Sequence, residues 1–212
     1  MKPLKPLIVF SGPDGAGKTT LAKMITAIIS RRSSVKIVRI RGTHTAAYLM
    51  MTFLRLFKGF KGRGLHYYGV RLPENMKGVW LWIELLSVAP LVILYYYLYR
   101  LRYTVISERG PFDLLIWLLT GLDLETTELS KRLPLRIILS WVMKFNTIYV
   151  RADKDILLSR KPEEHFLIEQ SFELGESLAR NLDLTFVDTT NKSPREYSKF
   201  IVQVFLSENK HV

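Results

Sequence analysis

The chain alternates short apolar runs with longer segments in which apolar positions recur every three to four residues. The short runs have the length of buried strands, and they cover residues 7–10, 36–40, 104–107, 147–150 and 184–187. The longer segments have helical periodicity, and they cover residues 18–31, 46–56, 111–121, 133–144, 154–160, 164–182 and 194–206. Strands that alternate with helices form parallel sheets covered on both faces. The pattern therefore predicts a doubly wound α/β fold with a five-stranded parallel sheet, as a single domain over residues 1–212.

Residues 79–102 form the most apolar segment of the chain. Pro90 interrupts this segment, and Glu84 is the one charged residue between Val79 and Tyr99. A carboxylate inside a bilayer costs about 3 kcal/mol, so we interpret the segment as two core or interface helices that meet at Pro90, not as a transmembrane span. A homodimer interface is the expected use of the surplus apolar surface. Peripheral membrane contact is an alternative that the sequence permits and does not favour.

Basic residues are concentrated in the first third of the chain. The interval between Asp14 and Glu74 contains twelve Lys and Arg residues and no acidic residue, while the whole chain has a net charge of +12. Within this interval, residues 58–71 are rich in Gly, Lys, Arg and Tyr and are predicted to form a basic loop. Such a segment attracts nucleotides, nucleic acid or acidic lipid. A basic face that only keeps the protein soluble is the alternative for residues outside the first turn.

Several kinds of chemistry are excluded by composition. The chain has no cysteine, so it has no disulfide, thiolate metal site or cysteine nucleophile. Its four histidines show no metal-ligand spacing. Residues 1–6 lack the hydrophobic region of a signal peptide, and we therefore expect a cytoplasmic protein.

The first predicted strand runs directly into a glycine-rich turn that has the pattern G-x-x-x-x-G-K-T. In such a turn the backbone N–H groups and the start of the following helix bind phosphate. The lysine, Lys18, can reach the β- and γ-phosphates, and the hydroxyl of Thr19 can bind Mg²⁺. The sequence therefore predicts a nucleoside triphosphate site composed of Gly12, Pro13, Asp14, Gly15, Ala16, Gly17, Lys18, Thr19 and Thr20.

Together with four further segments, this turn resembles the thymidylate kinase family of P-loop nucleoside monophosphate kinases. These segments are residues 105–109 (VISER), Arg41 after the second strand, Arg160 followed by residues 168–170, and residues 188–190. The resemblance covers almost the whole chain and implies a P-loop NTPase-type fold with a short lid at about residues 160–168. It also implies ATP and Mg²⁺ as cofactors, and transfer of the γ-phosphoryl group to a (deoxy)pyrimidine monophosphate, with dTMP as the expected acceptor.

The resemblance implies roles for individual residues around the acceptor. Arg41 and Arg109 would hold the acceptor phosphate, and Asp14 would face the acceptor sugar. Glu108 would hold metal-bound water or the acceptor hydroxyls, and the alternative is that it only orients Arg109. For Arg109 the residues give a second argument. It follows a strand at the edge where ligands of open α/β sheets bind, and its planar guanidinium suits a phosphate. A structural pair between Arg109 and a neighbouring carboxylate is the alternative.

The lid would complete the catalytic set. Gly15 stands where some relatives have an arginine, and in relatives with glycine there a lid arginine supplies charge in the transition state. This implies Arg160 as a catalytic residue beside Lys18 and Arg109, with the adjacent Lys161 as a substitute. The alternative for Arg160 is a solvated charge at a helix end.

The acceptor base is less well specified. Trp80, Trp82 and Phe53 are candidates for stacking on the base, although such aromatic residues more often belong to a core. The base-reading arginine of the family is missing near Ser87, and Leu167 replaces a second lid arginine. Two other functions are therefore kept as hypotheses. One is a P-loop kinase of a hydrophobic or membrane-associated acceptor, and the other is a non-catalytic protein that binds nucleotides or nucleic acid. The sequence has no RNA- or DNA-binding motif, so nucleic acid is not the expected partner.

Overall fold

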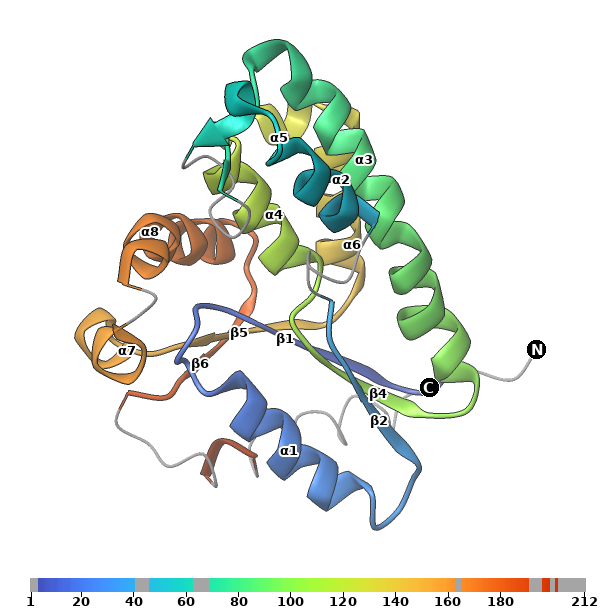
Figure 1. Cartoon of the computed structure of the whole chain (residues 1–212). Coiled ribbons are helices and arrows are strands. Elements are labelled where there is room, and N and C mark those ends of the chain that lie inside the picture. The colour runs from blue at the N-terminus through green and yellow to red at the C-terminus, as the bar shows by residue number, and fades with distance from the viewer. Residues whose placement is uncertain are drawn as a thin grey trace.

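The computed structural model describes residues 4–40, 46–62, 69–162, 165–190, 196–198 and Ile201. Its sheet has five parallel strands in the order β2-β4-β1-β5-β6 (Figure 1). The strands are β1 (Leu7–Ser11), β2 (Val35–Val38), β4 (Thr104–Glu108), β5 (Thr147–Arg151) and β6 (Thr185–Asp188). The predicted α/β fold with a five-stranded parallel sheet is thus confirmed.

Helices cover both faces of this sheet. One face carries α1 (Lys18–Ile29), and the other carries α3 (Glu74–Ile93), α4 (Pro111–Gly121) and α6 (Leu133–Lys144) (Figure 1). The remaining helical segments are α2 (Ala46–Leu54), the 3₁₀ turn η2 (Lys58–Phe60), the π-helical turn η4 (Leu94–Leu98), the 3₁₀ turn η5 (Tyr99–Leu101), α5 (Glu128–Lys131), α7 (Lys154–Arg160) and α8 (His165–Asn181).

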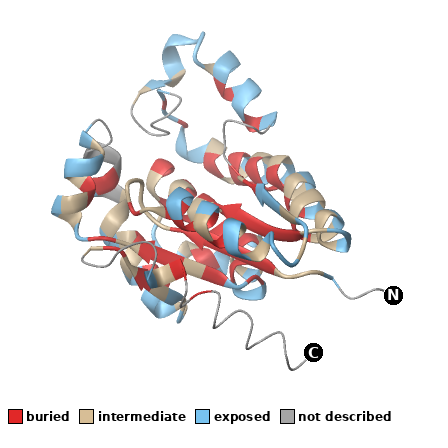
Figure 2. Ribbon diagram, turned by 90° about the horizontal axis from the view of Figure 1, so that it is seen from below, coloured by how far each residue is buried: buried red, intermediate tan, exposed pale blue. Residues whose placement is uncertain are grey.

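The central strand β1 shows why the strands of this sheet have continuous apolar sequences. Its side chains alternate between two hydrophobic clusters: Leu7 and Val9 pack in one, and Ile8 and Phe10 pack in the other. All four are buried, because helices cover both faces of a parallel sheet. Figure 2 shows the buried residues gathered along the sheet and on the sides of the helices that face it.

Pro90 does not divide the apolar segment 79–102, and that prediction is wrong. Helix α3 continues through Pro90 to Ile93 and passes directly into η4 and η5. A proline inside a helix removes one hydrogen bond, here the bond to the carbonyl of Leu86. Both Pro90 and Leu86 are exposed, so the missing bond lies on the outer side of the helix. After Ile93 the helix changes to π-helical bonding over Leu94–Leu98.

Glu84 lies on the core side of α3. Its side chain is fully buried, and neither carboxylate oxygen has a hydrogen-bond partner in the described part of the chain. Burial raises the pKa of this carboxyl to about 8, and the nearby Trp80 side chain offsets only part of that rise. At neutral pH the protonated form of Glu84 therefore predominates in the folded protein.

Other differences from the sequence-based expectations are local. Strand β2 ends at Val38, two residues before the predicted end, and the short helix α5 was not predicted. The predicted loop 58–71 contains η2 and an antiparallel bridge between Lys61 and Val70, while its residues 63–68 lie outside the described residues. Most of the predicted helix 194–206 also lies outside them.

Candidate functional site

The glycine-rich turn leaves β1 and enters α1 at the carboxyl edge of the sheet. Gly12 has a φ of 134°, and a Cβ atom there would lie 2.1 Å from the carbonyl oxygen of Val150. Any other residue would therefore have to displace the neighbouring strand. Gly17 precedes α1 with a φ of 90°, and no side chain caps the helix there. An uncapped helix start of this kind is suited to bind an anion through its N–H groups.

Lys18 lies across the inside of this turn. Its Nζ atom donates hydrogen bonds to the carbonyl oxygens of Gly12 (2.6 Å) and Pro13 (2.7 Å), and it lies 3.8 Å from Asp14 Oδ1. The side chain is 7% exposed. Its hydrogen bonds hold the ammonium inside the turn, where a phosphate group would bind.

Glu108 at the end of β4 connects α1 with the segment after β2. Its Oε2 atom accepts a hydrogen bond from Thr19 Oγ1 (2.9 Å) and forms an ion pair with Arg39. Arg39 also donates to Thr19 Oγ1 at 3.2 Å. Arg39 was not predicted as a site residue. The residue predicted here, Arg41, lies outside the described residues.

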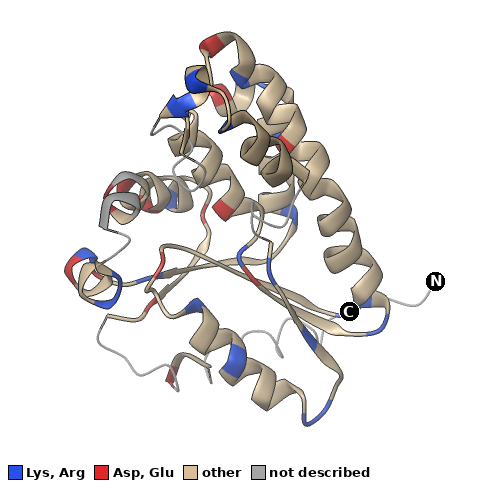
Figure 3. Cartoon of the chain, viewed as in Figure 1, with Lys and Arg blue, Asp and Glu red and all other residues tan. Residues whose placement is uncertain are grey.

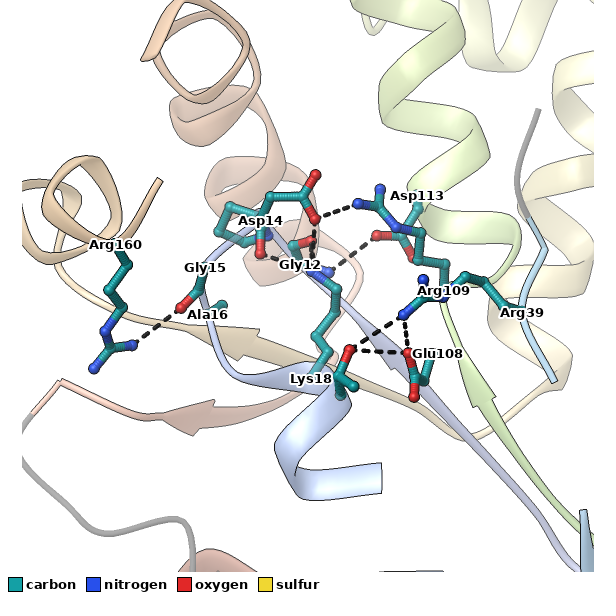
Figure 4. A network of polar contacts seen from close by, with 12 residues as sticks. Gly12, Asp14, Gly15, Ala16, Lys18, Arg39, Glu108, Arg109, Asp113 and Arg160 are labelled. Atoms are coloured by element: carbon teal, nitrogen blue, oxygen red, sulfur yellow. Dashed lines mark hydrogen bonds and ion pairs between the residues drawn. The ribbon is translucent and has the colours of Figure 1, made fainter. Parts of the chain in front are cut away.

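Arg109 has an unusual backbone conformation. Its φ is 94°, which non-glycine residues rarely adopt. Its N–H donates to Phe10 O at 2.8 Å, and its carbonyl accepts a bond from Ser107 Oγ at 2.6 Å. The guanidinium pairs with Asp14 Oδ1 (Figure 4). The sequence left a structural pair between Arg109 and a neighbouring carboxylate as an alternative role, and Asp14 is such a carboxylate.

Asp113 links this arginine segment to the glycine-rich turn. Its Oδ1 accepts a hydrogen bond from the Gly12 N–H at 3.2 Å, and its Oδ2 accepts one from the Gly110 N–H at 3.0 Å. Asp113 was also missed from the sequence. An acidic residue at the third position of a helix that begins with proline was the available signal.

Residues from the end of α7 and from the loop after β6 approach the turn from its other side. Arg160 Nη1 donates to the carbonyl oxygen of Gly15 at 3.0 Å, and Figure 4 shows its side chain extending toward that residue. Thr189 Oγ1 donates to Ala16 O at 2.9 Å. Of the lid predicted at residues 160–168, residues 163 and 164 lie outside the described residues.

These segments enclose a hollow of about 370 Å³. It is lined by Asp14, Gly15, Gly17, Lys18, Thr19, Thr20, Arg39, Glu108, Arg109, Arg160 and Lys161. Five of these side chains are basic and two are acidic, which favours a polyanionic ligand. None of the three predicted base-stacking residues lines this hollow. Phe53 on α2 and Trp82 on α3 are exposed, whereas Trp80 on α3 is buried in the core.

No group of three or more His, Asp or Glu side chains within the described ranges is arranged to hold a metal ion. The structure does bring together the two metal ligands expected from the sequence, because Thr19 Oγ1 and Glu108 Oε2 lie 2.9 Å apart. Two protein oxygens fit Mg²⁺, which in phosphate sites takes its other ligands from water and from the phosphates.

No protein-family model and no curated protein matches the chain. Solved structures of thymidylate kinases do match it. That of Candida albicans has a TM-score of 0.63 at 14% identity and covers 99% of this chain and 94% of its own. That of Ehrlichia chaffeensis has a TM-score of 0.56 at 14% identity and covers 96% of this chain and 100% of its own. The chain therefore has the fold of the thymidylate kinases.

Proposed function

We propose that the protein is a nucleoside monophosphate kinase that transfers the γ-phosphoryl group of Mg-ATP to a (deoxy)pyrimidine monophosphate, with dTMP as the expected acceptor. The observation that supports this most is the convergence of five basic side chains on one hollow beside the glycine-rich turn. Phosphoryl transfer needs positioning and cations around a spreading negative charge, and it needs little covalent chemistry from the protein.

The donor phosphates would lie in the turn Gly12–Thr20. Lys18 would exchange its bonds to the carbonyls of Gly12 and Pro13 for bonds to phosphate oxygens. Bound Mg²⁺ would neutralise charge on the β- and γ-phosphates. Thr19 and Glu108 would hold this ion, with Arg39 released from the same Glu108 oxygen.

Arginines would hold the acceptor from the opposite side. Arg109, fixed by the bonds of its own backbone, would bind the acceptor phosphate, and Asp14 would turn toward the acceptor sugar. Arg39 and Arg41 are the two candidates for a second contact to that phosphate. An acceptor phosphate oxygen attacks the γ-phosphorus, the bond from that phosphorus to the β–γ bridging oxygen breaks, and ADP leaves.

Arg160 would stabilise the transition state. It already reaches the backbone of the turn at Gly15, a residue without a side chain that could block it. A small movement of the end of α7 would bring its guanidinium to the γ-phosphoryl group. A cation in this role can contribute several powers of ten in rate.

The test is ADP release measured with dTMP, dUMP, UMP, CMP, AMP and GMP as acceptors. We expect turnover with dTMP or a related pyrimidine monophosphate, and none in Lys18→Ala. The matched control is Lys23→Ala, which removes an exposed lysine from the same helix and should keep full activity. No turnover with any monophosphate, together with no heat on titration with an ATP analogue, contradicts the proposal.

A second candidate function is supported by one observation. The outer side of α3 exposes apolar residues, among them Val79, Leu86 and Ile93, which suits a kinase whose acceptor is hydrophobic or membrane-associated. Turnover with a polyprenol or diacylglycerol acceptor, and none with the monophosphate panel, would favour it. The homodimer and the cytoplasmic location stay predictions. Base stacking by Phe53 and Trp82 has no support from the hollow, which neither residue lines.

A further inference from the structure

The outer side of the helix that runs from α3 into η5 is apolar along its length. One helix over Glu74–Leu101 is long and apolar enough to cross a membrane, but only 33% of its apolar window is buried in the fold. From Val79 to Leu101 the helix is about 33 Å long at 1.5 Å per residue. The exposed side chains along it are Val79, Trp82, Leu86, Pro90, Ile93, Leu98 and Leu101.

Helix α2 and the residues after it extend this apolar surface. The N–H of Ala47 on α2 donates a hydrogen bond to Ser87 Oγ on α3 at 2.8 Å, so the two helices are attached. The exposed apolar side chains here are Tyr48, Leu49, Met50, Phe53, Leu56 and Phe57. We call these residues and those of the α3 side the α2–α3 face. Soluble monomers rarely leave so large an apolar surface uncovered.

Cations lie at both ends of the α2–α3 face. At the α2 end the exposed basic residues are Arg55, Lys58, Lys61 and Arg71. At the other end Arg102 is exposed, and Lys36 Nζ lies 4.0 Å from the centre of the Tyr99 ring. Figure 3 shows basic residues near α2 and η2 and at the far end of η5.

Acidic side chains are nearly absent from the same elements. Over residues 46–62 and 69–103 the acidic residues are Glu74 and Glu84. Glu84 is buried in the core, and Glu74 is paired with Lys77 at 2.6 Å. The α2–α3 face therefore presents apolar and positive groups with no unpaired exposed carboxylate in its described part.

We propose that the α2–α3 face binds an anionic lipid surface. The helix cannot cross the bilayer in this fold, because Trp80, Leu81 and Glu84 on its inner side are buried against the rest of the domain. It would lie in the plane of the interface, with its apolar side chains among the acyl chains and the lysines and arginines at the headgroups. The same exposed residues support the second candidate function, but binding of this face to lipid does not require a lipid acceptor.

The competing occupant is a second copy of the chain, as the sequence analysis expected. Two copies related by a twofold axis would bring the same patch of each together. The cations of Arg55, Lys58 and Lys61 would then meet a patch without free carboxylates, which disfavours association. An anionic membrane complements both the apolar and the positive residues.

The test is sedimentation of the full chain with phosphatidylcholine vesicles, with and without phosphatidylglycerol. We expect binding only to the vesicles that contain phosphatidylglycerol, weakened by added salt. Each cation near such a surface contributes roughly fivefold in affinity, so Lys58→Gln/Lys61→Gln should lose about 25-fold. Leu49→Ser/Leu56→Ser should lose at least about tenfold, because each leucine buries apolar area in the acyl region.

Matched controls replace similar residues elsewhere. Met143→Ser alters an exposed apolar side chain on α6, and Lys23→Gln removes an exposed cation from α1; neither should change sedimentation. Absence of binding to any vesicle, equal binding to neutral vesicles, or equal loss in the controls overturns the proposal. A dimer in light scattering that Leu49→Ser/Leu56→Ser dissociates, without vesicle binding, assigns the face to a second copy instead.

Discussion

The buried carboxyl of Glu84 predicts how the stability of the protein changes with pH. Its pKa is raised from 4.5 to about 8 in the folded protein, whereas the unfolded chain has the ordinary value. Between these two values the folded state keeps a proton that the unfolded state releases, so the free energy of unfolding decreases as pH rises. The contribution is complete below about pH 4.5 and is lost by about pH 8.

The magnitude follows from the size of this shift. One pKa unit corresponds to about 1.4 kcal/mol, so the whole change is on the order of 5 kcal/mol, of which about 3 kcal/mol is already lost at pH 7. This is a large part of the stability of a typical domain. Glu84→Gln has nearly the same shape and stays neutral, and it should remove this dependence on pH.

Urea unfolding at pH 5, 6, 7 and 8 measures the effect. The difference in stability between Glu84→Gln and the wild type should shift in favour of the variant by about 4 kcal/mol between pH 5 and pH 8. Contributions of other titrating groups cancel in this difference. Glu74→Gln, at the exposed start of the same helix, should keep the slope of the wild type. Parallel curves for Glu84→Gln and the wild type would refute the reasoning.

Three further predictions concern the site. Gly12→Ala should destabilise the protein by about 3 kcal/mol or more and abolish nucleotide binding, since its Cβ would lie 2.1 Å from Val150 O. Gly59→Ala, whose Cβ meets nothing within 4 Å, should change the melting temperature little, and equal losses would contradict the steric argument. Because Arg109 has a φ of 94°, Arg109→Gly should be about 1 kcal/mol more stable than Arg109→Ala, and the reverse order in thermal melts would exclude strain there. Arg160→Ala should lower kcat by about 10³-fold or more, the size expected for an arginine that stabilises the transition state, with little change in nucleotide affinity. An unchanged kcat removes Arg160 from the mechanism.

The glycine-rich turn could be predicted because its chemistry is local in sequence. Strand, turn and helix are contiguous from Leu7 to Ile29, and the turn has glycine at the three positions with positive φ, Gly12, Gly15 and Gly17. The contact between Arg109 and Asp14 was also foreseeable in outline, since both follow strands that are neighbours in the sheet.

Features that depend on an exact boundary or on long-range packing could not be predicted. The run 36–40 suggested a strand that ends beside Arg41, but β2 ends at Val38, and Arg39, which was not predicted as a site residue, contacts Glu108. Pro90 normally ends a helix, yet tertiary packing on the inner side of α3 maintains it. The bridge from Asp113 to Gly12 joins residues that no local pattern relates.

The position of β1 in the middle of the sheet determines when the protein can fold during synthesis. Val9 has Ser107 and Thr147 as its partners in β4 and β5, so the strand leaves the ribosome long before either neighbour. Contacts between such distant segments make folding slow and leave intermediates exposed. The apolar helix α3 is translated within this interval, without the core that will cover its inner side. The nascent chain therefore exposes the apolar side chains of that helix until the later strands have been made.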